Sequence, residues 1–279
     1  MARIDRDGAY RFVARDQSVR HAAVPACEPD ARTRVQVTHV PLKPFLSDEA
    51  MRDNIRPAVF VDRADAGHRL AQRLMAMRWR APVVVLALPR GGVPVATEVA
   101  SALGAALDLL LVRKIGAPWN PELALAALVD GDPPEIVLND ELSDLAGADR
   151  SHIEAEALRA RSELERRRSV YLHGRAPLGV QGATVIVVDD GIATGTTMRA
   201  ALRALRRRRP GRLVLAVPVA PAAVLEALRA EADDVVCLRA PDDFDAVGEH
   251  YLDFRQVDDG DVTAALAKAG SGSKERNDA

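Results

Sequence analysis

The chain has 279 residues, of which 48% are hydrophobic, and its 38 basic side chains nearly balance 40 acidic ones, for a formal net charge of −2. This length and apolar content suit one large globular domain or two small ones. Because the near-neutral balance creates no overall basic field, it argues against nucleic acid as a partner, and any affinity for phosphate has to be local.

Cysteine content and hydropathy indicate the cellular compartment in which the protein is expected. Cys27 and Cys237 are the only cysteines, and two cysteines without a disulfide framework or metal-ligand spacing indicate a reducing compartment. The opening stretch MARIDRDGAYRF is polar, and no later apolar run is long enough to span a membrane. We therefore expect a cytoplasmic protein without a membrane partner.

Residues 1–56 differ from the rest of the chain. Scattered arginines, several prolines and no sustained hydrophobic period predict a loosely structured N-terminal extension, with residues 35–40 as a short candidate strand. We assign this arm no role. A folded domain is predicted over residues 57–257, and it starts with a helix over residues 62–78, where apolar side chains recur at helical spacing.

The next unit is a strand, a glycine turn and a helix. Residues 83–88 form an unbroken apolar run that predicts a buried strand, and residues 93–103 predict a helix. Between them lies the turn Pro89-Arg90-Gly91-Gly92, which places an arginine and backbone N–H groups at the carboxyl end of the strand. Such a turn is suited to binding an anion.

A third strand is predicted over residues 107–112. It ends in Arg113 and Lys114, so cations recur at the same edge of the predicted sheet. Residues 115–122 contain glycine and prolines and therefore predict a loop. Its Trp119 is either a lid anchor or a buried plug.

Periodicity also places the two elements that follow. Residues 123–129 and 135–138 are apolar runs separated by a Gly/Pro/Asp turn, which predicts a hairpin. Residues 148–172 predict a long helix, and its many arginines are typical of a solvated face.

The stretch from Thr184 combines a buried strand with two carboxylates and a hydroxyl-rich turn. The β-branched run Thr184–Val188 predicts a strand buried on both faces, followed by Asp189, Asp190, a turn over residues 191–197 and a helix over residues 198–208. Loop N–H groups, the helix N-terminus and threonine hydroxyls suit a phosphate, whereas paired carboxylates suit vicinal hydroxyls or a divalent cation. The alternative is a turn in which an aspartate only caps the helix. That alternative does not account for two acids before a Gly/Thr run.

The last elements complete the predicted fold. Residues 213–217, 222–230 and 235–238 predict a strand, a helix and a strand. Together these units predict an α/β fold, an open, doubly wound and mostly parallel sheet whose ligand cleft lies at the carboxyl ends of the strands. The hairpin forms a flap, and residues 239–256 form a small hood over the cleft. Residues 258–279 predict a C-terminal helix and a disordered polar tail that begins at Gly270.

The stretch 185–197 resembles the motif that binds 5-phosphoribosyl 1-diphosphate (PRPP) in type I phosphoribosyltransferases. The phrases LPRGG and LVRKIGAPWNPE, together with the hood, are similar to those of stand-alone bacterial phosphoribosyltransferase-domain proteins. The resemblance implies that Asp189 and Asp190 hold the ribose hydroxyls, directly or through Mg²⁺. It implies that the 5′-phosphate is held by Ala193, Thr194, Gly195, Thr196 and Thr197, and that Gly191 belongs to the same PRPP-binding turn. It further implies that the diphosphate is held by a turn that often contains a cis peptide, here Arg90, Gly91 and Gly92, and by Arg113 and Lys114.

The hood segment 241–254 resembles the base-binding segment of the 6-oxopurine phosphoribosyltransferases, although two spacings are each longer by one residue. The resemblance implies that Phe244 stacks on a base beside Val247, and that Asp253 joins the two aspartates near the metal. Phe244 as a core residue is the alternative. Ala193 departs from that class, which has an aspartate at this position. The adenine enzymes have Ala there and use an acid from the flap, for which Glu122 is the candidate. The sequence therefore leaves the acceptor base undecided.

The function that the resemblance implies is Mg²⁺-dependent transfer of the 5-phosphoribosyl group from PRPP to a small nitrogenous base, with release of diphosphate. A purine-like acceptor is favoured, as in nucleotide salvage, and a homodimer is implied because related enzymes are commonly dimers. One alternative is a regulator that binds PRPP without turnover. Another is hydrolysis or transfer on a different phosphorylated ribose. A sensor has little need of Arg90, Arg113 and a flap, so we favour the enzyme.

Overall fold

The computed structural model describes residues 2–4, 10–12, 60–131, 133–139, 150–173 and 175–274. Most of the N-terminal extension, with Cys27 and the candidate strand 35–40, lies outside the described residues. The described strands form two five-stranded sheets, one parallel and one antiparallel. Within this part of the chain, none of the helices has the length and apolar character needed to cross a bilayer.

The parallel sheet is built from the apolar runs of the sequence. Its strands lie in the order β10-β9-β8-β3-β4. Their bounds are β3 (Val83–Ala87), β4 (Ala106–Leu109), β8 (Thr184–Val188), β9 (Arg212–Val219) and β10 (Asp234–Arg239). β8 is central and buried at every residue, as expected of a strand that helices cover on both faces. The prediction of an α/β fold with a mostly parallel sheet is confirmed.

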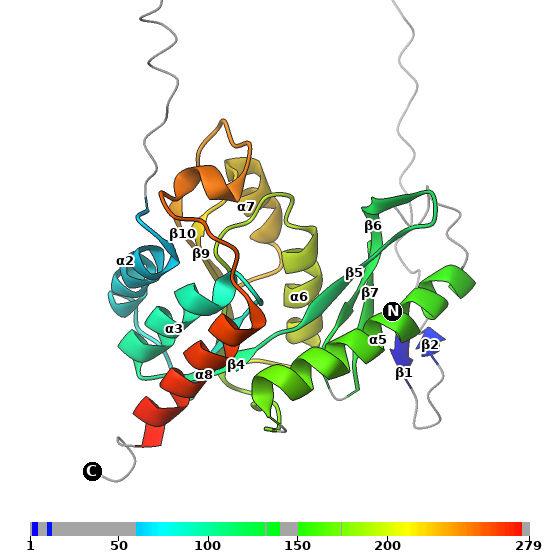
Figure 1. Ribbon diagram of the computed structural model, residues 1–279, viewed down its shortest axis with the longest axis horizontal. Helices are drawn as coiled ribbons and strands as arrows, with labels where there is room; N and C mark the ends of the chain where they lie inside the picture. The colour runs from blue at the N-terminus through cyan, green and yellow to red at the C-terminus, as the bar shows by residue number, and fades with distance from the viewer. Residues whose placement is uncertain are drawn as a thin grey trace, which may run out of the picture. The chain divides into compact units, whose positions relative to one another are not determined.

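Helices cover both faces of this sheet (Figure 1). Their bounds are α2 (Arg63–Met75), α3 (Gly92–Leu103), α6 (Thr196–Arg207), α7 (Ala222–Leu228) and α8 (Asp259–Lys274). In β8, Ile186 belongs to the apolar cluster that contains α2, α3 and α8, whereas Val187 belongs to the cluster that contains α6 and α7. Successive strand side chains point to opposite faces, so each face has its own core.

The chain changes its direction of winding between β3 and β8. β3 pairs with β4 on one side and with β8 on the other, and the second register ends at Ala87↔Val188. Leu88 extends this pairing by donating its amide to the carbonyl oxygen of Val188 at 2.9 Å. The turns after β3 and β8 therefore start next to each other, at the position where open α/β sheets bind ligands.

The antiparallel sheet contains the predicted flap hairpin and three further strands. Its order is β2-β1-β7-β6-β5, with bounds β1 (Ala2–Ile4), β2 (Tyr10–Phe12), β5 (Val112–Ala117), β6 (Asn120–Val129) and β7 (Glu135–Leu138). The antiparallel pairing of β6 with β7 confirms the hairpin. β1 and β2 were not predicted. The long helix is confirmed as α5 (Arg150–Leu172), whose Ile153 and Ala157 share an apolar cluster with Leu128 of β6.

Three predictions about element boundaries are wrong. Residues 107–112 are not one strand, because β4 ends at Leu109 and β5 begins at Val112 in the other sheet. Leu110 and Leu111, where the chain passes from one sheet to the other, are each only 1% exposed, so the apolar run continues across the boundary. Residues 115–122 are not a loop but the β5–β6 hairpin, whose register shifts on both sides of Gly116. Trp119 at its turn is 63% exposed. α8 continues past the predicted start of the tail to Lys274.

We expect Ile186→Ala to lower the free energy of unfolding by about 2–5 kcal/mol, since it deletes buried methyl groups and leaves a cavity. Ile186 is 0% exposed in the central strand. Leu158→Ala is the matched control, because this side chain on α5 is 52% exposed, and its effect should stay within about 0.5 kcal/mol. Urea denaturation measures both variants. Equal losses would contradict the placement of β8 at the centre of the core.

Candidate functional site

The turns after β3 and β8 are in direct contact. A Cβ atom built on Gly91 would lie 2.1 Å from Oδ2 of Asp190, and one built on Gly92 would lie 2.8 Å from Cα of Asp189. A side chain at position 91 would therefore occupy the space that the carboxylate fills. The structure thus brings the predicted diphosphate turn and the predicted acidic pair together in one site.

The two adjacent carboxylates have different surroundings. Asp190 accepts a hydrogen bond from Nε of Arg63 at 2.7 Å, in an ion pair whose side chains are only 10% and 13% exposed. Asp189 accepts a hydrogen bond from the amide of Asp190 at 2.9 Å. Burial, and then the neighbouring charge of Asp190, raise the pKa of the Asp189 carboxyl well above its ordinary value. A cation or a pair of hydroxyl donors at this point would stabilise the ionised pair.

Arg90 stands at the edge of the same site. It follows a cis peptide bond after Pro89, the feature that the resemblance implies for this turn. Its Nη1 lies 3.7 Å from Oδ1 of Asp259 at the start of α8, and its side chain is 35% exposed. Asp259 is itself held by the hydroxyl of Tyr171, which donates to Oδ1 at 2.6 Å. The guanidinium is therefore held loosely and keeps a surface that an anion can reach.

The predicted phosphate turn leads into the N-terminus of α6. Gly195, with φ of 75°, is the N-cap, and Arg199 donates its amide to the carbonyl oxygen of Gly195 at 2.8 Å. The amides at the start of a helix have no carbonyl partner within the helix. Ala193, Thr194 and Thr197 are exposed beside them. Backbone N–H groups and hydroxyl groups thus gather at the N-terminus of α6, where helices commonly bind phosphate.

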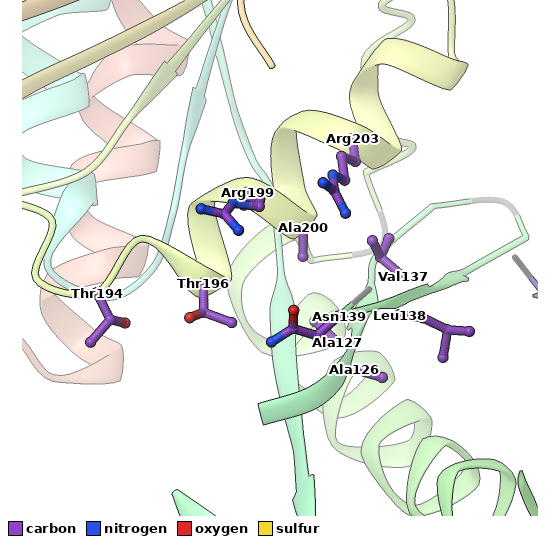
Figure 2. Close-up of a pocket in the computed structure, with 10 residues that line it drawn as sticks. All are labelled: Ala126, Ala127, Val137, Leu138, Asn139, Thr194, Thr196, Arg199, Ala200 and Arg203. Carbon is purple, nitrogen blue, oxygen red and sulfur yellow. The ribbon is translucent and has the colours of Figure 1, made fainter. Parts of the chain in front are cut away.

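A cavity of about 100 Å³ adjoins this turn, between α6 and the strands β6 and β7 (Figure 2). Thr196, Arg199, Ala200 and Arg203 line it, and their spacing of three and four residues places them on one face of α6. The other lining residues are Ala126, Ala127, Val137, Leu138, Asn139 and Thr194. The two arginines were not predicted as site residues, although their spacing from Thr196 is a signal that could have found them, and Arg203 pairs with Glu231 at 2.7 Å.

The hood contacts the acidic turn through Val247, the first residue of the short helix η1 (Val247–His250). A Cβ atom built on Gly191 would lie 2.5 Å from Cγ1 of Val247. Tyr251, just after η1, donates its hydroxyl to the backbone oxygen of Asp190 at 2.5 Å. Burial, and then the charge of Asp190, raise the pKa of that hydroxyl. The hood is thus in direct contact with the turn that carries the acidic pair.

The two other hood candidates have different contacts. Phe244 is half-buried and stacks on His250, with ring centroids 5.3 Å apart, so it packs as the core alternative describes. Asp253 is exposed, and its Oδ1 accepts a hydrogen bond from the amide of Arg255 at 3.1 Å. The roles of Phe244 toward a base and of Asp253 toward a metal stay predictions.

The flap candidates lie in the antiparallel sheet. Arg113 and Lys114 are exposed residues of β5, not the end of a third parallel strand as predicted, because β4 ends at Leu109. Glu122 belongs to β6, but its side chain lies outside the described residues. The diphosphate role of the two cations and the catalytic role of Glu122 stay predictions.

The residues present fit a Mg²⁺ ion in part. In the part of the chain that the structure describes, no three His, Cys, Asp or Glu side chains are grouped so as to hold a metal ion. Mg²⁺, however, commonly uses only one or two protein carboxylates together with waters and substrate phosphates. Asp189 and Asp190 supply two such carboxylates at the carboxyl end of β8. The acidic pair therefore fits the ion, without support for Asp253 as a third ligand.

Sequence reasoning also missed two residues that hold the site. Arg63 begins α2 and pairs with Asp190, and Asp259 begins α8 and lies beside Arg90. Neither belongs to a motif, and Arg63 is 127 positions away from its partner. No local pattern in the sequence could have identified them.

Comparison with known proteins assigns most of the described chain to one family model. Residues 61–255 match the model described as a phosphoribosyl transferase domain. Proteins of Mycobacterium tuberculosis strains CDC 1551 / Oshkosh and H37Rv, each named "putative phosphoribosyl transferase", are 44% identical over 211 residues, or 76% of this chain and 47% of each relative. The chain thus spans about half the length of the curated relatives it matches.

A solved structure is similar as well. The crystal structure of the protein TT1426 from Thermus thermophilus is 48% identical in sequence and has a TM-score of 0.66. The similarity covers 75% of this chain and 98% of that chain. The shared fold therefore extends over nearly the whole of the Thermus protein.

We expect Gly91→Ala to displace the Asp190 carboxylate, because the new Cβ would lie 2.1 Å from Oδ2 and 2.6 Å from Cγ of that side chain. A crystal structure of the variant measures the displacement. Gly179→Ala is the control, since a Cβ there meets nothing within 4 Å. An Asp190 carboxylate that keeps its position in the Gly91 variant would contradict the close contact of the two turns.

Proposed function

We propose the function of this chain from one premise: the chain belongs to the phosphoribosyl transferase domain family. It binds PRPP and transfers the 5-phosphoribosyl group to a small nitrogenous base, and diphosphate is released. The observation that carries the proposal is the contact between the turn 89–92 and the acidic pair. This contact sets donors for an anion and acceptors for hydroxyls side by side at the switch point of the sheet.

The groups of PRPP correspond to the groups gathered at the site. The turn 193–197 and the N-terminus of α6 offer donors for the 5′-phosphate. Asp189 and Asp190 accept hydrogen bonds from the vicinal ribose hydroxyls. Arg90 and the amide of Gly91 face the diphosphate. A single ligand thus uses both turns.

The transfer breaks the bond between C1 of the ribose and the diphosphate oxygen, and the nitrogen of the base forms a bond to C1. Positive charge develops on the sugar and negative charge on the leaving group. Arg90 stabilises the leaving diphosphate, and the acidic pair holds the ribose in place for the attack. Mg²⁺, held by Asp189 and Asp190, would supply further positive charge to the diphosphate oxygens.

The acceptor is proposed to be a purine-like base bound under the hood. Val247 brings an apolar side chain against the acidic turn. Phe244 stacks on His250 with one face and would offer its other face to the base. Ala193 has no acid for handling the proton of the base. We therefore assign the proton transfer to Glu122 of the flap.

Incubation with PRPP, Mg²⁺ and a panel of purines, pyrimidines and amines tests the proposal, with diphosphate release as the readout. Release that depends on one class of acceptor supports the transferase. Binding of PRPP without release under every acceptor favours a PRPP-binding regulator instead. Release without an acceptor favours hydrolysis, and a protein that does not bind PRPP refutes the proposal.

We expect Asp189→Asn to weaken PRPP binding about 10- to 100-fold, since a hydrogen bond to a charged group contributes about 1.5–3 kcal/mol. The substitution keeps the shape of the side chain and removes its charge. Isothermal titration in the presence of Mg²⁺ measures the Kd. Glu226→Gln on α7 is the control, because this carboxylate is 79% exposed and distant in sequence from both turns. Equal affinity of the Asp189 variant and the wild type would remove the role of the acidic pair.

A further inference from the structure

Arg63 connects parts of the site that are far apart in the sequence. It is the first residue of α2, and its side chain is 10% exposed. Its Nε donates to Oδ2 of Asp190 at 2.7 Å, and its Nη1 donates to the backbone oxygen of Arg255 at 2.8 Å. The charge-assisted bond to Asp190 is largely shielded from solvent, and such a bond fixes the orientation of both groups more firmly than an exposed one.

Phe254 completes the surroundings of this guanidinium. Cζ of Arg63 lies 3.8 Å from the centroid of the Phe254 ring, which is within the range of a cation–π contact. The Phe254 ring in turn packs against Tyr251, with centroids 5.0 Å apart. Because the guanidinium is planar and its donors lie in its plane, contact with the ring and with two acceptors defines its orientation.

The hood is attached to the start of α2 by backbone pairing. Phe60 donates its amide to the carbonyl oxygen of His250 at 3.0 Å and accepts from the amide of Leu252 at 2.9 Å. Tyr251, between these two hood residues, donates its hydroxyl to the backbone oxygen of Asp190. The start of α2, the hood and the acidic turn therefore form a closed set of contacts.

We propose that Arg63 is a positioning residue for PRPP. It holds the Asp190 carboxylate in the orientation that meets the ribose hydroxyls, and it ties that orientation to the hood. This inference rests on the proposed function. An ionised carboxylate has about four lone-pair sites, so the bond to Arg63 leaves acceptor capacity for the ligand. The charge of Arg63 also offsets one of two adjacent carboxylate charges that would otherwise repel each other.

Titration of PRPP in the presence of Mg²⁺ tests the proposal. We expect Arg63→Gln to raise the Kd at least about 10-fold, since the charged hydrogen bond to Asp190 is lost. Arg63→Lys keeps the charge without the planar fork, so its Kd should lie between those of the wild type and Arg63→Gln. Arg73→Gln is the matched control, because Arg73 is exposed on the same helix, and it should leave the Kd unchanged. An unchanged Kd in Arg63→Gln overturns the proposal.

The coupling between Arg63 and Asp190 separates positioning from a general structural role. If Arg63 acts through Asp190, adding Arg63→Gln to Asp190→Asn raises the Kd for PRPP little further. Adding Arg63→Gln to Arg90→Gln instead raises the Kd by the full factor seen for Arg63→Gln alone. Full additivity in both backgrounds overturns the proposal. If Arg63→Gln does not fold, Phe254→Leu removes the ring contacts with Arg63 and Tyr251 and keeps the ion pair of Arg63 with Asp190, so it should raise the Kd by a smaller factor. A Phe254→Leu variant with wild-type affinity then counts against the proposal.

Failure of the proposed function gives a different pattern of results. A wild-type protein that does not bind PRPP refutes the function, and the position of the Asp190 carboxylate is then read from a crystal structure of Arg63→Gln. A carboxylate that keeps its place shows that Arg63 does not position it. A displaced carboxylate supports the positioning role apart from the identity of the ligand.

Discussion

The parallel pairing of β3 with β8 is the constraint on which the rest of the site depends. It starts two turns at the same edge of the sheet, one carrying Arg90 and one carrying two carboxylates. Gly91 then allows the turns to approach until the Asp190 carboxylate fills the space of a missing side chain. A ligand that presents both anionic groups and vicinal hydroxyls can therefore contact both turns at once, whereas either turn alone would bind only half of it.

Two carboxylates at a largely desolvated point cost free energy, and surrounding elements offset that cost. Arg63 pairs with Asp190, and the backbone amide of Asp190 donates a hydrogen bond to Asp189. Burial nevertheless raises the pKa of the Asp189 carboxyl. At the other turn, the carboxylate of Asp259 lies near the guanidinium of Arg90 and partly balances its charge. Asp190 is thus oriented by a helix that lies outside both turns, whereas Arg90 has only a long contact with Asp259. Groups oriented before the ligand arrives need little reorganisation when charge develops, which is the usual source of electrostatic stabilisation in an active site.

The antiparallel sheet borders a cavity beside the turn 193–197. β6 and β7 face α6 across a cavity, and one face of α6 carries Arg199 and Arg203 into its lining. The position of this sheet follows from the crossing at Leu110 and Leu111, where the chain leaves the parallel sheet immediately after β4. The antiparallel sheet begins directly after β4, so it lies beside the carboxyl edge of the parallel sheet, where both turns are found.

The sequence by itself determined the elements whose signal is local. The buried strands are unbroken apolar runs, and the two turns are short motifs, so their residues could be identified before their positions were known. Burial alone does not say which sheet a residue joins, so the boundary at Leu110 and Leu111 was predicted wrongly. Only the tertiary structure decided that Gly91 touches Asp190 and that Arg63 and Asp259 support the site. The reason is physical: an ion pair between residues 127 positions apart, such as Arg63 and Asp190, leaves no periodic trace in the sequence and exists only once the sheet has folded.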